Sequence, residues 1–360
     1  MKYRVAQVGC GARGKIHLDG WLAHPDCFEL VAVCEIDAAK MQEAVNERGI
    51  SPRLYSDAEQ MLAEVRPDVF CFSTQPHIRL SMVQLAAKYG VKGLVFEKPM
   101  ATSPAEAWAI TQLCRQHGIK AAVSHQQKYL TSFQRLKAII DAGEIGDIDR
   151  IHASCQAGLS QLGTHYTDYV LWATGGQRAE WVVGHVHGRE MLADSHPAPN
   201  YTMGQFVLRN GIRAFVEFGK LAASHMPPEK YWLDNRLTVY GTHGFVWCDT
   251  DGRWGACTRA SGGEVIGEVG DGWEIQQSTR LQPLFARDLA TWLDDDRKVH
   301  PCNLEITYHG YEILEAMCIS ALEHRRVDLP LDPSQCDDLF ARMRLELPEC
   351  AEYTPGTPIS

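Results

Sequence analysis

The chain opens with the stretch YRVAQVGCGARG (residues 3–14), in which a strand-like apolar run leads directly into a glycine-rich turn. Its glycines, Gly9, Gly11 and Gly14, follow the spacing GxGxxG. A pyrophosphate can approach a backbone only where no Cβ intervenes, and the free N–H groups at a helix N-terminus attract its charge. A second apolar run ends at Glu35, where an acidic side chain can hold the adenosine ribose hydroxyls. Together these features predict the first βαβ unit of a dinucleotide-binding domain.

Each residue of the turn has an expected role in holding the cofactor. Gly9 permits the tight turn, Gly11 admits the phosphates, and Gly14 lets the following helix pack closely on the first strand. Ala12 and Arg13 lie between these glycines and are expected to contact the cofactor as well. The acidic side chain that ends the second run repels a 2′-phosphate, and no arginine immediately follows it. We therefore expect NAD as the cofactor, with NADP less favoured.

The chain has 360 residues, a formal net charge of −10 and 12 cysteines. Its length predicts two domains, and its negative charge argues against a nucleic-acid partner. No stretch approaches the roughly 20 apolar residues that a membrane span needs, and the N-terminus begins as a strand instead of a signal peptide. The cysteines are scattered without a CxxC pair, which favours reduced thiols. These features predict a cytoplasmic protein with no membrane partner.

Strand-like and helix-like segments alternate along the first third of the chain, which predicts a doubly wound Rossmann domain over residues 1–124. Beyond it, helices are expected at Leu281–Leu293 and Leu304–Glu323. The expected strands there are Ile148–Cys155, Trp181–His187, Met203–Leu208, Ile212–Phe218 and Arg236–Tyr240. This pattern predicts an α+β domain with a largely antiparallel open sheet over residues 125–340, followed by an irregular tail at 341–360.

The tripeptide Glu97-Lys98-Pro99 follows a buried strand-like run of the first domain. Ligands of doubly wound sheets bind at the carboxyl ends of the strands, which assigns Lys98 to the active site and both Glu97 and Lys98 to the cofactor. Pro99 biases the backbone of Lys98 away from helix and permits a cis bond. The alternative interpretation of Lys98 is a solvated surface lysine.

This tripeptide resembles a motif of the glucose-fructose oxidoreductase, inositol dehydrogenase and MocA (Gfo/Idh/MocA) family. The resemblance extends over nearly the whole chain, through GEIG at 143–146, GTHYTD at 163–168 and VYGTHG at 239–244. It implies a nicotinamide-dependent oxidoreductase that acts on a secondary hydroxyl or keto group of a sugar, sugar derivative or cyclitol. It also implies a homodimer or homotetramer, which we expect to form through the C-terminal sheet. The family's motif lysine corresponds to Lys98, and the histidine of its GxHxxD element corresponds to His165.

Reaction chemistry supports the same pair of residues. Hydride transfer from a carbinol carbon leaves a proton on the hydroxyl oxygen, so the site needs a base and a donor that stabilises negative charge. His165 can supply the base, and Lys98 can supply the cation. Asp168 lies three residues after His165 on the same helix face, where its carboxylate could orient the imidazole or bind substrate. His165 could instead be a core histidine.

One position departs from the family pattern. The family commonly carries an aspartate four residues before this histidine, whereas this chain has Gln161. An amide cannot act as a proton-accepting base. Three interpretations stay open: Gln161 only hydrogen-bonds the substrate, Asp168 compensates, or the proton follows another route.

Two further segments are candidates for ligand contacts. Ser73 and Thr74 follow the fourth strand and are expected beside the nicotinamide ribose and phosphates, unless they only cap a helix. Lys128 and Tyr129 follow the sixth strand and could bond sugar hydroxyls, or form a charged hinge with a buried tyrosine. No metal site is expected, because the strand-borne pair His185 and His187 has no evident third ligand.

Three functions remain compatible with the sequence. The favoured function is an NAD-linked dehydrogenase or reductase of a sugar-like polyol. The second is a glycosidase that uses tightly held NAD for transient oxidation, elimination and readdition. The third is a catalytically silent dinucleotide-binding sensor, which Gln161 favours and which Lys98 and His165 oppose.

Overall fold

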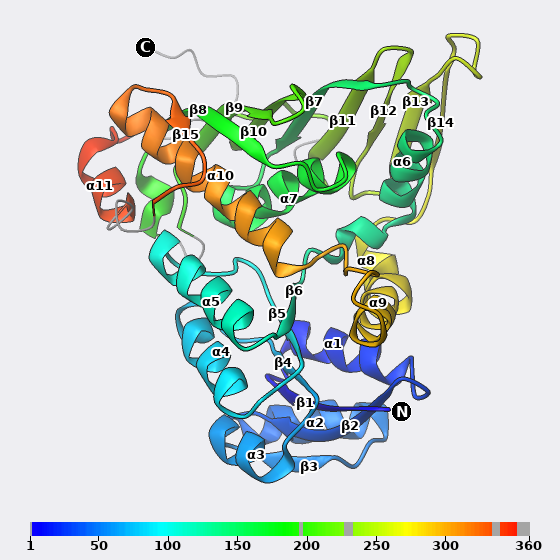
Figure 1. The fold of residues 1–360 in the computed structure, drawn as a ribbon, viewed down its shortest axis with the longest axis vertical. Helices are drawn as coiled ribbons and strands as arrows, with labels where there is room; N and C mark the ends of the chain where they lie inside the picture. Colours follow the sequence, from blue (N-terminus) through cyan, green and yellow to red (C-terminus); the bar gives the residue numbers. More distant parts are fainter. Residues whose placement is uncertain (1, 194–196, 227–232, 333–338, 351–360) are drawn as a thin grey trace. The chain divides into compact units, whose positions relative to one another are not determined.

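A computed structural model of the chain describes residues 2–193, 197–226, 233–332 and 339–350 (Figure 1). The chain forms two compact units, and each is made of separate stretches of sequence. The first contains residues 1–135, 250–253 and 269–308, and the second contains the rest.

The first unit is built on a six-stranded parallel sheet in the order β3-β2-β1-β4-β5-β6. Its strands are β1 (Tyr3–Val8), β2 (Phe28–Cys34), β3 (Arg53–Tyr55), β4 (Val69–Phe72), β5 (Gly93–Phe96) and β6 (Lys120–Val123). This order reverses direction between β1 and β4, and ligands of such sheets bind where the order reverses. The predicted doubly wound domain is confirmed.

Helices connect these strands in the alternating pattern that the sequence predicts. They are α1 (Ala12–Leu22), α2 (Ala38–Arg48), α3 (Ala58–Val65), α4 (Arg79–Lys88) and α5 (Pro104–Gln116), with a 3-10 turn η1 (Pro76–Ile78) before α4. The side chain of Ser103 accepts a hydrogen bond from the Glu106 N–H and so caps α5. Every residue of β4 and β5 is buried, as expected for strands covered on both faces.

The second unit is built on a nine-stranded sheet in the order β14-β13-β12-β11-β7-β10-β9-β8-β15. Its strands are β7 (Ile148–Cys155), β8 (Ala179–His187), β9 (Tyr201–Leu208), β10 (Arg213–Gly219), β11 (Asn235–Gly241), β12 (Gly244–Cys248), β13 (Arg253–Cys257), β14 (Val265–Val269) and β15 (Val327–Asp328). Neighbouring strands are mostly antiparallel, and β7 and β10 are parallel. The predicted α+β fold with a largely antiparallel sheet is confirmed.

Helices α7 (Thr164–Ala173) and α10 (Leu304–Glu323) cover one face of this sheet (Figure 1). At Gly184 a Cβ would lie 2.3 Å from the carbonyl oxygen of Met317, so α10 approaches β8 more closely than a side chain would allow. Side chains alternate between the faces of a strand. Val182 and Val186 are therefore buried toward the helices, while Val183 on the opposite face is exposed.

The expected domain limits differ from the observed units. Helix α9 (Gln282–Asp294) lies in the stretch assigned to the second domain, but it packs on α1 of the first unit. Gly20 of α1 makes this possible, because its built Cβ would lie 2.8 Å from the Cγ atom of Gln282. The expected irregular tail also differs, since α11 (Leu339–Glu346) extends into it. Residues 351–360 of that tail lie outside the described residues.

Two more helices and four short helical turns lie outside the elements named so far. They are α6 (Thr131–Asp141), α8 (Trp273–Gln276), η2 (Gln126–Tyr129), η3 (Leu159–Gly163), η4 (Glu190–Ala193) and η6 (Gln277–Leu281). Every cysteine in the described stretches is a free thiol. None of the helices in these stretches combines the length and apolar character that a membrane crossing requires.

Candidate functional site

The glycine-rich turn between β1 and α1 has room for a ligand at one of its glycines. Gly9 has a φ of +95°, and a Cβ there would lie 2.7 Å from the carbonyl oxygen of Ser73. A Cβ on Gly14 would lie 2.1 Å from the carbonyl oxygen of Gly9. By contrast, no atom of the described residues lies within 4 Å of a Cβ built on Gly11. The protein itself therefore requires glycine at positions 9 and 14, while position 11 faces open space.

The N-terminus of α1 carries the features of an anion site. Its N-cap is Gly11, so no side chain caps the helix, and the first turn contains no acidic residue. The first N–H groups of a helix have no intrahelical partners, and the helix dipole places partial positive charge there. These residues therefore fit the pyrophosphate of a dinucleotide.

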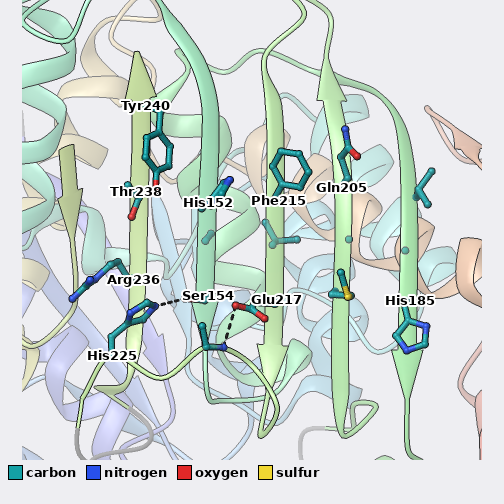
Figure 2. A pocket seen from close by; sticks show the side chains of 17 residues that line it. His152, Ser154, His185, Gln205, Phe215, Glu217, His225, Arg236, Thr238 and Tyr240 are labelled. Atoms are coloured by element: carbon teal, nitrogen blue, oxygen red, sulfur yellow. Dashed lines mark hydrogen bonds between the residues drawn. The ribbon is translucent and has the colours of Figure 1, made fainter. Parts of the chain in front are cut away.

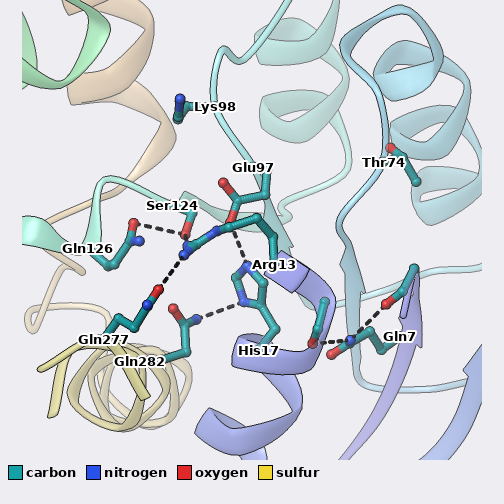
Figure 3. Close-up of polar contacts among 12 residues, drawn as sticks. Gln7, Arg13, His17, Thr74, Glu97, Lys98, Ser124, Gln126, Gln277 and Gln282 are labelled. Carbon is teal, nitrogen blue, oxygen red and sulfur yellow. Dashed lines mark hydrogen bonds and ion pairs between the residues drawn. The ribbon is translucent and has the colours of Figure 1, made fainter. Parts of the chain in front are cut away.

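Gln7 holds the turn in place from inside β1 (Figure 3). Its side-chain amide donates to the carbonyl oxygen of Gly9 at 3.1 Å and to that of Gly14 at 2.8 Å. Its amide oxygen accepts from the indole N–H of Trp21 at 3.0 Å. The sequence motifs do not predict this role of Gln7, although a glutamine inside an apolar strand is a signal that its amide needs buried partners.

Glu35 comes directly after β2 and lies beside the turn. Its carboxylate accepts from the Cys10 N–H at 2.8 Å and from the Asp37 N–H at 3.2 Å. The side chain is thus fixed at the end of the second strand, where a ribose contact is expected. The carboxylate also ties the end of β2 to the turn.

Glu97 is the centre of a buried polar network in the first unit (Figure 3). Its Oε1 atom lies 3.0 Å from the Arg13 guanidinium and 3.0 Å from Nε2 of His17, while Gln282 lies 2.7 Å from Nδ1 of His17. Burial alone would raise the pKa of Glu97, but the charge of Arg13 and the hydrogen bond from His17 hold it well below its usual value. Burial lowers the pKa of His17, so the imidazole stays neutral. Arg13 thus has an acidic partner in the protein, and its cofactor contact stays a prediction.

Lys98 follows Glu97 at the carboxyl end of β5, and its peptide bond to Pro99 is cis. Burial lowers the pKa of Lys98 to about 8; Glu97 opposes this shift, and the charges of Arg13 and Arg79 add to it. An ammonium with this pKa loses its proton closer to neutral pH than a surface lysine does. Burial and neighbouring charges therefore give the Lys98 ammonium a lower pKa than a lysine on the protein surface has.

Ser73 and Thr74 follow β4, the strand next to β5. The N–H of Ser73 donates to the carbonyl oxygen of Val8, which brings this loop beside the glycine-rich turn. Both hydroxyl oxygens are buried without a hydrogen-bond partner among the described residues. Buried polar groups normally have a partner, so these hydroxyls fit a site that a polar ligand completes.

The candidate residues of the second unit lie in and before α7. His165 and Asp168 are buried in that helix, and Gln161 lies in the preceding turn η3. Nδ1 of His165 lies 2.8 Å from the hydroxyl of Tyr169, one helical turn further on. From the sequence, Asp168 is the group expected to orient this imidazole. Tyr169 was missed, and its only signal was the spacing of four residues.

Lys128 and Tyr129 lie in the first unit, and their side chains are buried. The Lys128 ammonium donates to the carbonyl oxygen of Pro301 at 2.6 Å. The Tyr129 hydroxyl donates to Asp288 at 2.6 Å. These contacts favour the structural interpretation of both residues over contact with a sugar.

A hollow of about 540 Å³ lies on the second sheet, on the face opposite α7 and α10 (Figure 2). Ser154 and His225 line it and are hydrogen-bonded at 2.8 Å, and Glu217 accepts from the Ala223 N–H at 3.0 Å. None of the residues predicted to bind cofactor or substrate lines this hollow. Among the described residues, no group of three or more histidine, cysteine or acidic side chains is placed to hold a metal.

Comparison with known proteins gives a family match for the N-terminal third of the chain. Residues 3–125 match the Gfo/Idh/MocA family, described as an oxidoreductase family with an NAD-binding Rossmann fold. D-apiose dehydrogenase of Paraburkholderia graminis is 31% identical over 145 residues, which are 40% of this chain and 38% of that protein. Inositol 2-dehydrogenase of Burkholderia lata is 26% identical over 168 residues, which are 46% of this chain and 49% of that protein. The match thus spans less than half the length of these relatives.

Solved structures resemble almost the whole chain. Levoglucosan dehydrogenase in complex with NADH and levoglucosan has a TM-score of 0.77 at 17% identity, over 92% of this chain and 100% of that chain. The WlbA dehydrogenase of Bordetella pertussis, in complex with NADH and UDP-GlcNAcA, has a TM-score of 0.70 at 21% identity, over the same shares. At these identities the likeness establishes the fold. The prediction of an NAD-binding Rossmann domain is confirmed.

Proposed function

Because the N-terminal domain of this chain belongs to the Gfo/Idh/MocA family of NAD-binding oxidoreductases, we propose that the protein is an NAD-dependent dehydrogenase or reductase. Its substrate is a sugar, sugar derivative or cyclitol, which reacts at a secondary hydroxyl or keto carbon. The observation that carries this proposal is Lys98, a partly desolvated ammonium at the carboxyl edge of a sheet whose glycine-rich turn fits a pyrophosphate.

NAD, when bound, supplies the acceptor or donor of the hydride. Lys98 donates a hydrogen bond to the substrate oxygen and stabilises the negative charge that develops there. His165 accepts the hydroxyl proton during oxidation and returns it during reduction. Tyr169 supports this role, because its hydroxyl lies 2.8 Å from Nδ1 and fixes the orientation of the imidazole ring. Gln161 contributes a hydrogen bond to the substrate and no charge.

Other residues of the first unit hold the cofactor in this proposal. The turn residues Gly9, Gly11, Ala12 and Gly14 surround the pyrophosphate, and Glu35 binds the adenosine ribose and disfavours a 2′-phosphate. The unpartnered hydroxyls of Ser73 and Thr74 bond the nicotinamide half. Glu97 fixes the backbone beside Lys98 through its contacts to Arg13 and His17.

We also propose that the protein forms a homodimer or homotetramer through the open face of the second sheet. Met203 is 46% exposed and Val183 is 45% exposed on this face, where they border the hollow. Exposed apolar side chains on an open sheet face are removed from water when a partner packs on them. A second copy of the chain presents the same surface and satisfies the two-fold symmetry of a dimer. The cytoplasmic location stays a prediction.

The decisive experiment incubates the purified protein with NAD and a panel of sugars, sugar acids, inositols and aryl glycosides, and measures NADH and glycosidic cleavage together. A dehydrogenase accumulates NADH with at least one polyol. Cleavage of an aryl glycoside without net NADH would favour the glycosidase, and NAD binding with neither product across the panel would favour the sensor. The glycosidase and the sensor have no support from the relatives named above.

The substitution Lys98→Ala tests the proposed role of the ammonium. We expect turnover to fall by at least about 10²-fold, because the developing charge loses its donor. The affinity for NAD, measured by fluorescence titration, should stay within severalfold. Lys92→Ala is the matched control, since Lys92 is an exposed lysine that pairs with Asp68 at the opposite end of β5. Wild-type turnover in Lys98→Ala would remove the proposed chemistry.

A further inference from the structure

Arg79 is a charged residue in an unusual position for its type. It is the first residue of α4, and only 1% of its surface is exposed. Its hydrogen bonds run to two main-chain carbonyl oxygens instead of a carboxylate. Burial of a guanidinium without a hydrogen-bonded acidic partner destabilises the folded protein. A functional role would explain why a buried arginine stands at this position.

The contacts of Arg79 join the two loops that carry the proposed chemistry. Its Nη2 atom donates to the carbonyl oxygen of Lys98 at 3.0 Å and lies 3.4 Å from that of Thr74. Thr74 follows β4 and Lys98 follows β5, and these strands are neighbours in the sheet. The guanidinium therefore bridges the carboxyl ends of two adjacent strands. Its Nε and Nη1 atoms have no hydrogen-bond partner among the described residues, so within these residues the bridge holds all the side-chain hydrogen bonds of the guanidinium.

The charges around Lys98 come from three elements of the first unit. Glu97 attracts the Lys98 ammonium, while Arg13 of α1 and Arg79 of α4 repel it. Glu97 also attracts the Arg79 guanidinium, together with Glu106 of α5. His17 stays neutral and bonds Glu97. Arg79 thus acts on Lys98 both through the backbone and through its charge.

We propose that Arg79 is the positioning residue of Lys98: it clamps the Lys98 carbonyl to the Thr74 loop and keeps a second positive charge beside the ammonium. The clamp fixes the backbone from which the lysine side chain extends toward the substrate oxygen. The charge lowers the pKa of Lys98, and while this ammonium is protonated its greater acidity makes it a stronger hydrogen-bond donor to the substrate oxygen. This inference rests on the proposed function for the step that Lys98 performs.

The test compares Arg79→Gln and Arg79→Lys with the control Lys88→Gln, which removes an exposed charge at the other end of α4. The first readout is the pH dependence of Lys98 acylation by an amine-selective reagent, followed by mass spectrometry of the peptide, without cofactor. The second readout is the pH dependence of kcat and kcat/KM. Thermal melting reports on the folding of each variant.

Arg79→Gln removes the charge and the clamp. The midpoint of Lys98 acylation should rise by at most about one pH unit, because Arg79 acts on Lys98 less strongly than burial, Glu97 and Arg13 do, and kcat should fall by about tenfold to a hundredfold. Arg79→Lys keeps a charge, but its side chain is shorter and its ammonium does not reach the two carbonyl oxygens that Nη2 of Arg79 contacts, so the midpoint should stay near the wild-type value while kcat falls. The control should match the wild type in both readouts.

Two results would overturn the inference. One is an Arg79→Gln protein whose melting temperature falls while the acylation midpoint and kcat stay unchanged, since a residue that only packs would behave in this way. The other is an Arg79→Lys protein with wild-type kcat. This result would exclude the positioning role of Arg79 even if Arg79→Gln does not fold. If the wild type shows no turnover, the proposed function fails, whereas the acylation midpoint still tests the influence of Arg79 on Lys98.

Discussion

The protonation of Lys98 gives the enzyme an expected pH dependence. Burial lowers the pKa of this lysine to about 8, so the cation is lost as the pH rises through that value. Because the proposed donor must be protonated, kcat/KM for alcohol oxidation should fall above pH 8, and Lys98→Arg should lack this limb. A pH–rate profile from 6 to 10 tests the expectation. A rate that rises through pH 8 would assign Lys98 the role of the base instead.

Glu35 is expected to set the choice between NAD and NADP. In Glu35→Ala the carboxylate no longer repels a 2′-phosphate, so the ratio of kcat/KM for NADP to that for NAD should rise by about tenfold, or about 1.4 kcal/mol. Glu29→Ala is the control, because Glu29 is exposed at the start of the same strand. An unchanged ratio would contradict the contact between Glu35 and the ribose. The variant also loses the hydrogen bond from the Cys10 N–H, and this loss affects NAD and NADP alike.

In the turn between β1 and α1, one glycine is expected to be needed for folding and another for cofactor binding. A Cβ on Gly14 would overlap the Gly9 carbonyl, so Gly14→Ala should lower the melting temperature at a cost of about 1–3 kcal/mol. A Cβ on Gly11 meets no protein atom, so Gly11→Ala should melt like the wild type and bind NADH at least about tenfold more weakly. Thermal melting and NADH fluorescence titrations measure the two effects. Wild-type NADH affinity in a folded Gly11→Ala protein would show that Gly11 does not face the pyrophosphate.

Helix α9 shows how an element can belong to a unit that is distant in sequence. Its local pattern correctly predicts a helix at 281–293, and the structure has Gln282–Asp294. The pattern contains nothing about the partner, because amphipathic helices fit many apolar surfaces. The contact of Gln282 with Gly20 and His17 decides the partner, and it depends on shape and hydrogen bonding between residues far apart in the chain.

For the molecule as a whole, the open face of the second sheet is expected to bury itself in an oligomer. Met203→Glu places a charge on this face, so light scattering after size-exclusion chromatography should detect a smaller assembly than for the wild type. Val299→Glu is the control, because Val299 is an exposed apolar residue of the first unit. A wild-type protein that is monomeric at micromolar concentration would contradict the proposed interface.

The sequence by itself determined the features whose physical causes are local. Gly9 and Gly14 are readable because backbone conformation and close approach within the protein demand glycine, and Gly11 is readable because a pyrophosphate needs open access there. Strand and helix periods reveal the alternation of the first domain. The tertiary structure alone decided that Gln7 pins the turn, that Arg79 bridges to Lys98, and that residues 269–308 return to the first unit. These contacts join residues whose side chains meet only after packing, and a buried polar group has many sequence-compatible partners until the fold selects one.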